Sequence, residues 1–92
     1  MNVTVFKSPA ELGKIIALNV RACRKARKFS MGHLSELSGV SYGSIKRFET
    51  TGEISLMSLL KIAIVLECTD EFETLFAEIR PMSIREIIDG KL

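Results

Sequence analysis

The sequence is poor in the residues that build metal sites and disulfide frameworks. It has one histidine, and its two cysteines, Cys23 and Cys68, lie in opposite halves of the chain without further ligand-type residues at metal-site spacing. A disulfide framework or a metal site would need more cysteines, or histidines at ligand spacing. We therefore interpret both cysteines as buried thiols of a cytoplasmic protein, and we expect neither a metal nor a cofactor.

Other absences narrow the class of protein further. No apolar run reaches the roughly 18 residues that a membrane-spanning helix needs, and no secretory signal pattern opens the chain. A glycine-rich phosphate loop and a nucleophile–base pairing are also missing, so an enzyme is not expected. With 92 residues, of which 47% are hydrophobic and 26% charged, the sequence is typical of one small globular domain.

What the sequence does contain is an uneven distribution of charge. Residues 1–47 hold nine Lys and Arg against two acids, a net charge of +7, whereas residues 48–92 hold four against nine, a net charge of −5. Together the halves give the net charge of +2. This asymmetry favours one face that meets a polyanion and another that is turned away from it.

Capping signals predict an almost wholly helical chain. Ser8, Pro9 and Glu11 form a helix start with a capping box, and serines precede three further apolar periodicities, at Ser30, Ser41 and Ser55. We expect helices at residues 9–28, 31–38, 42–50, 56–67 and 70–79. Beyond them, Pro81 breaks the chain and Ser83 begins another capping box, while residues 1–6 alternate weakly like a short strand.

Apolar spacing assigns an inner face to each expected helix. In the first helix this face is Leu12, Ile15, Ile16, Asn19, Val20 and Cys23. In the second and third helices it is Leu34, Leu37, Ile45 and Phe48. In the last two helices it is Leu56, Leu59, Leu60, Ala63, Ile64, Leu66, Phe72, Leu75, Phe76 and Ile79.

The segment GVSYGSIKRFETTGEIS, residues 39–55, includes the connection between the second and third helices. Gly39 suits a left-handed helix end, Val40 a buried turn, and Ser35 is small where the two helices cross. Two short helices joined by such a glycine-containing turn form a helix-turn-helix, here about residues 30–50. With Ile45 and Phe48 inward, the helical period turns outward Tyr42, Gly43, Lys46 and Arg47.

A helix of this kind suits the major groove of DNA. Small residues near its start, Ser41, Gly43 and Ser44, permit close approach to the bases, and its free N–H groups favour a phosphate. Lys46 and Arg47 suit the O6 and N7 acceptors of guanine. We therefore predict that the bases are read by Tyr42, Gly43, Lys46 and Arg47.

Residues 12–67 resemble the lambda repressor/Cro-like (Xre-type) family of helix-turn-helix domains, through RKARKFSMGHLSELSGVSYGSIKRFE and SLMSLLKIAIVL. The resemblance implies an all-α, five-helix lambda repressor-like DNA-binding domain over residues 1–80, with a short C-terminal extension at residues 81–92. It implies a transcriptional regulator that binds double-stranded DNA as a homodimer on an inverted-repeat operator. It also implies an ion pair that clamps the third helix to the first, between Arg24 and Glu49.

The sequence departs from the family pattern at two positions. Many members contact a phosphate through glutamine at the start of the second helix, where this chain has Met31, whose side chain cannot make that contact. Gly43 stands where many relatives place a base-reading side chain, so fewer direct base contacts are expected. The residues that we expect at the DNA backbone are Ser30, Met31, Ser41, Ser44, Thr50 and Thr51.

The C-terminal segment EFETLFAEIRPMSIREIIDGKL goes beyond the minimal family domain. Its isoleucines Ile84, Ile87 and Ile88 are expected to form a dimer seam, or alternatively to fold back on the core. A second interpretation keeps the fold, because the chain also resembles HipB-like antitoxin regulators of kinase toxin–antitoxin operons, which implies a toxin protein bound by the acidic half. A third interpretation is a protein-interaction module without DNA binding.

Overall fold

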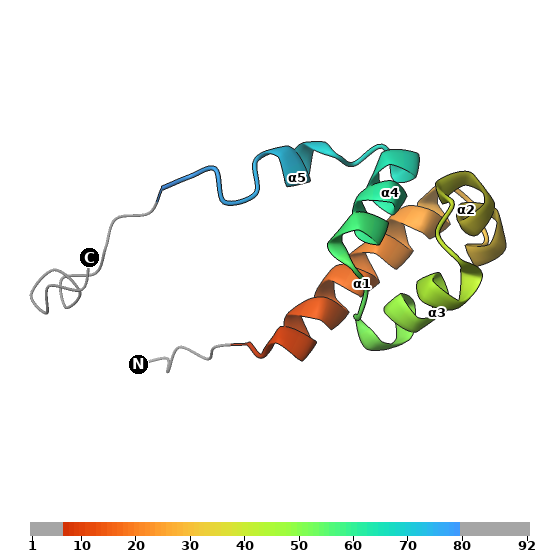
Figure 1. The fold of residues 1–92 in the computed structure, drawn as a ribbon, viewed down its shortest axis with the longest axis horizontal. Coiled ribbons are helices and arrows are strands. Elements are labelled where there is room, and N and C mark those ends of the chain that lie inside the picture. Colours follow the sequence, from red (N-terminus) through yellow and green to blue (C-terminus); the bar gives the residue numbers. More distant parts are fainter. Residues whose placement is uncertain (1–6, 80–92) are drawn as a thin grey trace, which may run out of the picture.

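The computed structural model of the chain describes residues 7–79. Within this range the chain is all-helical, with α1 at Pro9–Ala26, α2 at Met31–Ser38, α3 at Tyr42–Thr51, α4 at Leu56–Leu66 and α5 at Asp70–Glu73 (Figure 1). None of these helices is long and apolar enough to cross a membrane. The expectations for residues 1–6, for the capping box at Ser83 and for Ile84, Ile87 and Ile88 lie outside the described residues.

The four predicted serine caps are confirmed. Each side chain of Ser8, Ser30, Ser41 and Ser55 accepts a hydrogen bond from the backbone N–H three residues later, which satisfies one of the free N–H groups of a helix start. At α1 the capping box is complete, since the Ser8 N–H donates to Glu11 Oε1 at 2.8 Å. These bonds lower the pKa of the Glu11 carboxyl, chiefly the bond from the Ser8 backbone.

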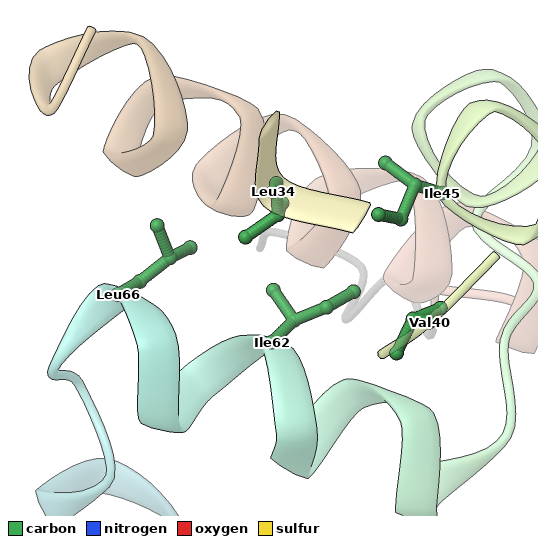
Figure 2. Packing of buried hydrophobic residues seen from close by; sticks show 5 residues of the cluster. All are labelled: Leu34, Val40, Ile45, Ile62 and Leu66. Atoms are coloured by element: carbon green, nitrogen blue, oxygen red, sulfur yellow. The ribbon is translucent and has the colours of Figure 1, made fainter. Parts of the chain in front are cut away.

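The core lies where α2, α3 and α4 meet. Leu34 of α2, Ile45 of α3 and Ile62 of α4 are almost fully buried, and Val40 and Leu66 complete the cluster (Figure 2). A second, smaller cluster joins α1 to α3 and α4 and contains Ala17, Phe48 and Leu59. Burying large apolar side chains stabilises a fold by about 1.5–3 kcal/mol each, so the first cluster fixes α2 and α3 on α4.

Small residues bring α1 and α3 together. A Cβ placed on Gly13 of α1 would lie 2.8 Å from the carbonyl oxygen of Gly52, the residue that ends α3. The backbone of Gly52 has a φ of +82°, and a Cβ there would lie 2.5 Å from the Gly13 carbonyl carbon. Glycine at both positions therefore allows the two backbones to pass at close range.

The inner face predicted for α1 is largely wrong. Leu12, Ile15 and Ile16 are 48%, 39% and 43% exposed, and Asn19 and Cys23 are exposed as well. The interpretation of both cysteines as buried thiols is therefore wrong, since Cys23 is exposed and Cys68 is only partly buried. The buried positions of α1 are instead Ala17 and Arg24. The physical reason is that close backbone packing selects small side chains, so the packed face of α1 is not its most apolar face.

In α2 and α4, too, some residues that were predicted to be buried are exposed. Leu37, Leu56 and Ile64, which were predicted to be buried, are 51%, 62% and 65% exposed. Ile62, which the prediction left out, is completely buried in the main core cluster. In α4, Leu59, Ala63 and Leu66 of the predicted stripe are buried as expected. Leu56 and Ile64 were wrongly included because α4 is apolar on nearly all sides, so the sequence pattern does not single out one face.

The fifth helix is much shorter than predicted. It covers Asp70–Glu73 only, and Thr69 at its start makes no side-chain cap. Phe72 is half-buried, but Leu75 is 57% exposed and Phe76 and Ile79 are each 93% exposed. Short helices depend on packing for their stability, and the last three of these side chains lie away from the core of the described residues.

We expect Gly13→Ala to destabilise the fold by about 1–3 kcal/mol, because its Cβ meets the backbone of Gly52 and the two helices must move apart. Urea unfolding followed by circular dichroism measures the change. The matched control is Gly32→Ala in α2, whose Cβ comes no closer than 3.9 Å to Ser30 Oγ. This control is expected to be neutral, or more stable by up to about 1 kcal/mol. Equal stability of both variants would contradict the close contact.

Candidate nucleic-acid interface

The turn between α2 and α3 is closed by local hydrogen bonds. Gly39 ends α2 in the left-handed region with a φ of +77°, as predicted. The Ser35 hydroxyl donates to the Val40 carbonyl at 2.6 Å, and Ser38 Oγ accepts from the Val40 N–H at 3.1 Å. Because Val40 itself is buried, the turn is fixed from both sides and sets the direction of α3.

One side of α3 is open to solvent. Ile45 and Phe48 are buried to 1% exposure, whereas Tyr42, Lys46 and Arg47 are exposed. A Cβ on Gly43 would meet no atom within 4 Å, so nothing in the described fold requires a glycine at this position. The orientation predicted for this face from the helical period is therefore present.

Arg47 is engaged on this surface. Its Nη2 donates to Glu53 Oε1, and both side chains are about two-thirds exposed. The pair borders a hollow of about 390 Å³ between α3 and the start of α4, lined by Ser44, Arg47, Glu53, Ile54, Ser55 and Ser58. An exposed pair of this kind contributes little to stability, so Arg47 can exchange Glu53 for another anionic partner at small cost.

A second hollow of about 270 Å³ lies on the other flank of α3. Its lining brings together residues of three helices, namely Arg21, Arg24, Met31, Lys46, Glu49 and Thr50. Three cations face one carboxylate here, so the hollow carries a net positive charge. Three of the residues predicted to contact DNA, Met31, Lys46 and Thr50, thus share one concave surface.

The predicted backbone-contacting serines differ in what their hydroxyls do. The Ser41 hydroxyl donates to Ser44 Oγ at 2.8 Å, and so its proton is used within the helix start. Ser30 Oγ accepts from the His33 N–H, and Ser44 Oγ accepts from Ser41. Within residues 7–79 neither Ser30 nor Ser44 donates its own hydroxyl proton, so both retain a donor for a phosphate oxygen.

The two threonines at the end of α3 are tied to the helix. Thr50 Oγ1 donates to the Lys46 carbonyl at 2.8 Å, and Thr51 Oγ1 donates to the Arg47 carbonyl at 2.7 Å. Thr51 also accepts from the Glu53 N–H, so its hydroxyl is engaged twice. Both side chains would have to rotate to donate to DNA, which makes them weaker candidates than Ser30 and Ser44. Met31 packs against the main core cluster.

The ion pair predicted between Arg24 and Glu49 is present and buried. Arg24 Nε donates to Glu49 Oε2 at 2.7 Å, and Arg24 Nη2 donates to Glu49 Oε1 at 2.9 Å. Arg24 Nη1 also donates to the Phe29 carbonyl at 2.7 Å, which connects the α1–α2 turn to the same point. Hydrogen bonding to Glu49 raises the pKa of the Arg24 guanidinium, and α3 is thereby held to α1 by a two-pronged contact.

Comparison of the chain with protein-family models gave no match, and comparison with curated proteins gave no significant match. The family named from the sequence therefore stays a prediction, and the site is argued from its own geometry. Within residues 7–79 no group of three or more His, Cys, Asp or Glu side chains is placed to hold a metal ion.

Two residues of this surface were not singled out from the sequence. Arg21 borders the positive hollow beside Lys46, and its Nε lies 3.9 Å from Glu49 Oε1. Glu53 pairs with Arg47. Arg21 had a detectable signal, because it lies one helical turn before Arg24 and so on a neighbouring part of α1. Glu53 had none, because its pairing depends on how Gly52 turns the chain.

The acidic part of the chain lies away from α3. Residues 67–79 contain five acids and no Lys or Arg. Figure 1 shows α5 and α3 on opposite sides of α1. The charge asymmetry found in the sequence therefore becomes a spatial one within the described residues, with Lys46 and Arg47 on the side away from these acids.

We expect Arg24→Met to destabilise the fold by about 3–5 kcal/mol, because it leaves the Glu49 carboxylate buried without its partner. Glu49→Leu strands the guanidinium in the same way. The double variant should be more stable than the sum of both losses predicts, by about 0.5–3 kcal/mol, since it removes both charges. Urea unfolding of the four proteins measures this coupling, and strictly additive losses would contradict a direct pair.

Proposed function

We propose that the protein is a sequence-specific DNA-binding transcriptional regulator that inserts α3 into the major groove. The observation that carries the proposal is the open side of α3, where Lys46 and Arg47 project from a helix whose other side is buried and pinned to α1. An α-helix with its side chains is about 10–12 Å across, so a major groove about 12 Å wide admits α3.

The surroundings of α3 suit the phosphates that border the groove. The positive hollow on one flank places Arg21 and Lys46 together, and Ser30 and Ser44 retain hydroxyl donors. In the proposed complex these groups contact the DNA backbone and set the position of α3, while Lys46 and Arg47 contact base edges. Gly43 leaves space for the helix start to approach the bases closely.

A second candidate function is that of an antitoxin in a kinase-type toxin–antitoxin operon. It is favoured by the exposure of Phe76 and Ile79, each 93%, within an acidic segment on the side away from α3. Such a segment suits a protein partner with a basic, partly apolar surface. Co-purification with the product of the neighbouring gene is the experiment that separates the antitoxin from a regulator without such a partner.

Replacing both exposed cations of α3, Lys46→Ala with Arg47→Ala, is expected to abolish specific binding and to leave the fold intact. The remaining, non-specific affinity should depend on salt concentration about as steeply as before, because the proposal places these two cations on base edges and not on phosphates. Fluorescence anisotropy with a duplex from upstream of the protein's own gene measures both quantities. The matched control is Lys61→Ala, an exposed cation of α4. An unchanged affinity in the folded double variant would refute the placement of α3 in the groove.

Glu53→Gln is expected to increase DNA affinity by up to about fivefold, because Arg47 no longer has to leave a carboxylate when it meets DNA. The same anisotropy assay measures the effect. Glu73→Gln in α5 removes the same charge far from α3 and serves as the control, for which only a small change is expected. If Glu53→Gln lowers the affinity, the carboxylate positions Arg47 for binding and does not compete for it.

A further inference from the structure

The helix α1 presents three different faces. Gly13, Ala17 and Arg24 face α3 through the close backbone contact and the buried ion pair. Lysines and arginines form a basic face, at Lys14, Arg21 and Lys25. The remaining face is apolar or small, and the described residues leave it open. It consists of Leu12, Ile15, Asn19, Ala22 and Ala26. We call this third set the open face of α1.

The open face is exposed although most of its residues are apolar. Leu12 and Ile15 are 48% and 39% exposed, and Asn19, Ala22 and Ala26 are exposed as well. Figure 1 shows the N-terminal turns of α1 at the edge of the domain, with no other described helix beyond them. Contiguous apolar surface of this kind marks an interaction site.

The spacing of the open face is that of a helix-pairing seam. Positions 12, 15, 19, 22 and 26 alternate in steps of three and four, which keeps them along one line of a helix that packs on another helix. Four of the five are apolar or small, and the central one is Asn19. A single polar residue at such a position fixes the register of a helix pair.

We propose that the open face binds the α1 helix of a second copy of this chain, with the two helices antiparallel. The first argument is shape. Large side chains, Leu12 and Ile15, lie in the N-terminal half of the face, and small ones, Ala22 and Ala26, lie in the C-terminal half. An antiparallel pair sets large side chains against small ones, whereas a parallel pair sets alanine against alanine and leaves voids.

The second argument is charge complementarity. Glu11 and Lys25 lie on the same flank of the seam, two heptads apart, near opposite ends of α1. In an antiparallel pair the Glu11 of one copy stands opposite the Lys25 of the other, and symmetry forms this pair twice. In a parallel pair Glu11 would lie at the same end as its own counterpart. Asn19 lies at the centre of the seam, so its two copies meet in either orientation and do not select between them.

The pairing has a consequence for DNA that rests on the proposed function. In an antiparallel helix pair related by a two-fold axis, a face that flanks the seam in one copy lies on the same side of the dimer as the same face of the other copy. The basic faces of both copies, with Arg21 and Lys25, therefore lie on one side of the dimer. A single duplex on that side would meet two basic surfaces and two α3 helices.

The test is sedimentation of the full-length chain without nucleic acid, so that it is independent of DNA binding. The wild type is expected to be a dimer at tens of micromolar, and Leu12→Glu, in the seam, is expected to be a monomer. The matched control is Leu37→Glu, since Leu37 of α2 is 51% exposed against 48% for Leu12. This control should remain dimeric, and circular dichroism should show both variants folded. A monomeric wild type, or a dimer that Leu12→Glu does not weaken, would overturn the proposal.

Crosslinking tests the orientation without relying on a destabilising charge. In a Cys23→Ala, Cys68→Ala background, Asn19→Cys should form a disulfide-linked dimer with oxidised glutathione as oxidant. Ile15→Cys should crosslink when mixed with Ala22→Cys but not with itself. Self-crosslinking of Ile15→Cys would show a parallel pair. If no crosslink forms at position 15, 19 or 22, the open face is covered otherwise, by residues 80–92 or by another protein. Either result overturns the proposal.

Discussion

The backbones of α1 and α3 run close together because glycines meet where the chain leaves α3, and the position of every exposed side chain of α3 follows from this contact. Gly13 and Gly52 allow the approach, and the Arg24–Glu49 pair closes the contact further along α1. With this side of α3 occupied, only the opposite side remains for solvent. The packing of α3 on α1 therefore turns Lys46 and Arg47 toward solvent. Any change that separates α1 from α3 also changes the direction of these two side chains.

The buried ion pair adds direction to this contact more than it adds stability. Taking a guanidinium and a carboxylate out of water costs several kcal/mol per ion, and the two bonds between them offset that cost only when their geometry is good. Here the geometry is two-pronged, and a third bond from Arg24 reaches the Phe29 carbonyl in the α1–α2 turn. One side chain thus ties together α1, the turn before α2 and the end of α3, which leaves little freedom for α3 to swing as a rigid body.

Local signals predicted much of this structure, and tertiary choices explain the rest. Serine caps and Gly39 gave the helix starts and the turn, because these features depend on neighbouring residues only. The outward direction of Lys46 followed from the helical period. The inner face of α1 was misassigned because its packed residues, Gly13 and Ala17, carry no hydrophobic signal. The length of α5 was overestimated because its sequence is amphipathic, but the described residues offer no apolar surface on which the second half of the predicted helix could pack. The pairing of Arg47 with Glu53 could not be predicted from the sequence, because it depends on how Gly52 turns the chain after α3.

The misassigned residues of α1 are informative. Most of them are apolar, as the sequence pattern indicated, but they do not pack against the core of their own chain. A helix that packs through small residues has large apolar side chains left for another contact, and α1 carries Leu12 and Ile15 on a face that the described chain leaves open. The same rigid helix also holds α3. In the proposed dimer, pairing through α1 would therefore fix the distance and the angle between two α3 helices through three packed contacts, one between the two α1 helices and one between α1 and α3 in each copy. Such a short, stiff connection selects for DNA with two half-sites at one spacing, whereas a dimer joined through a flexible segment would accept many spacings.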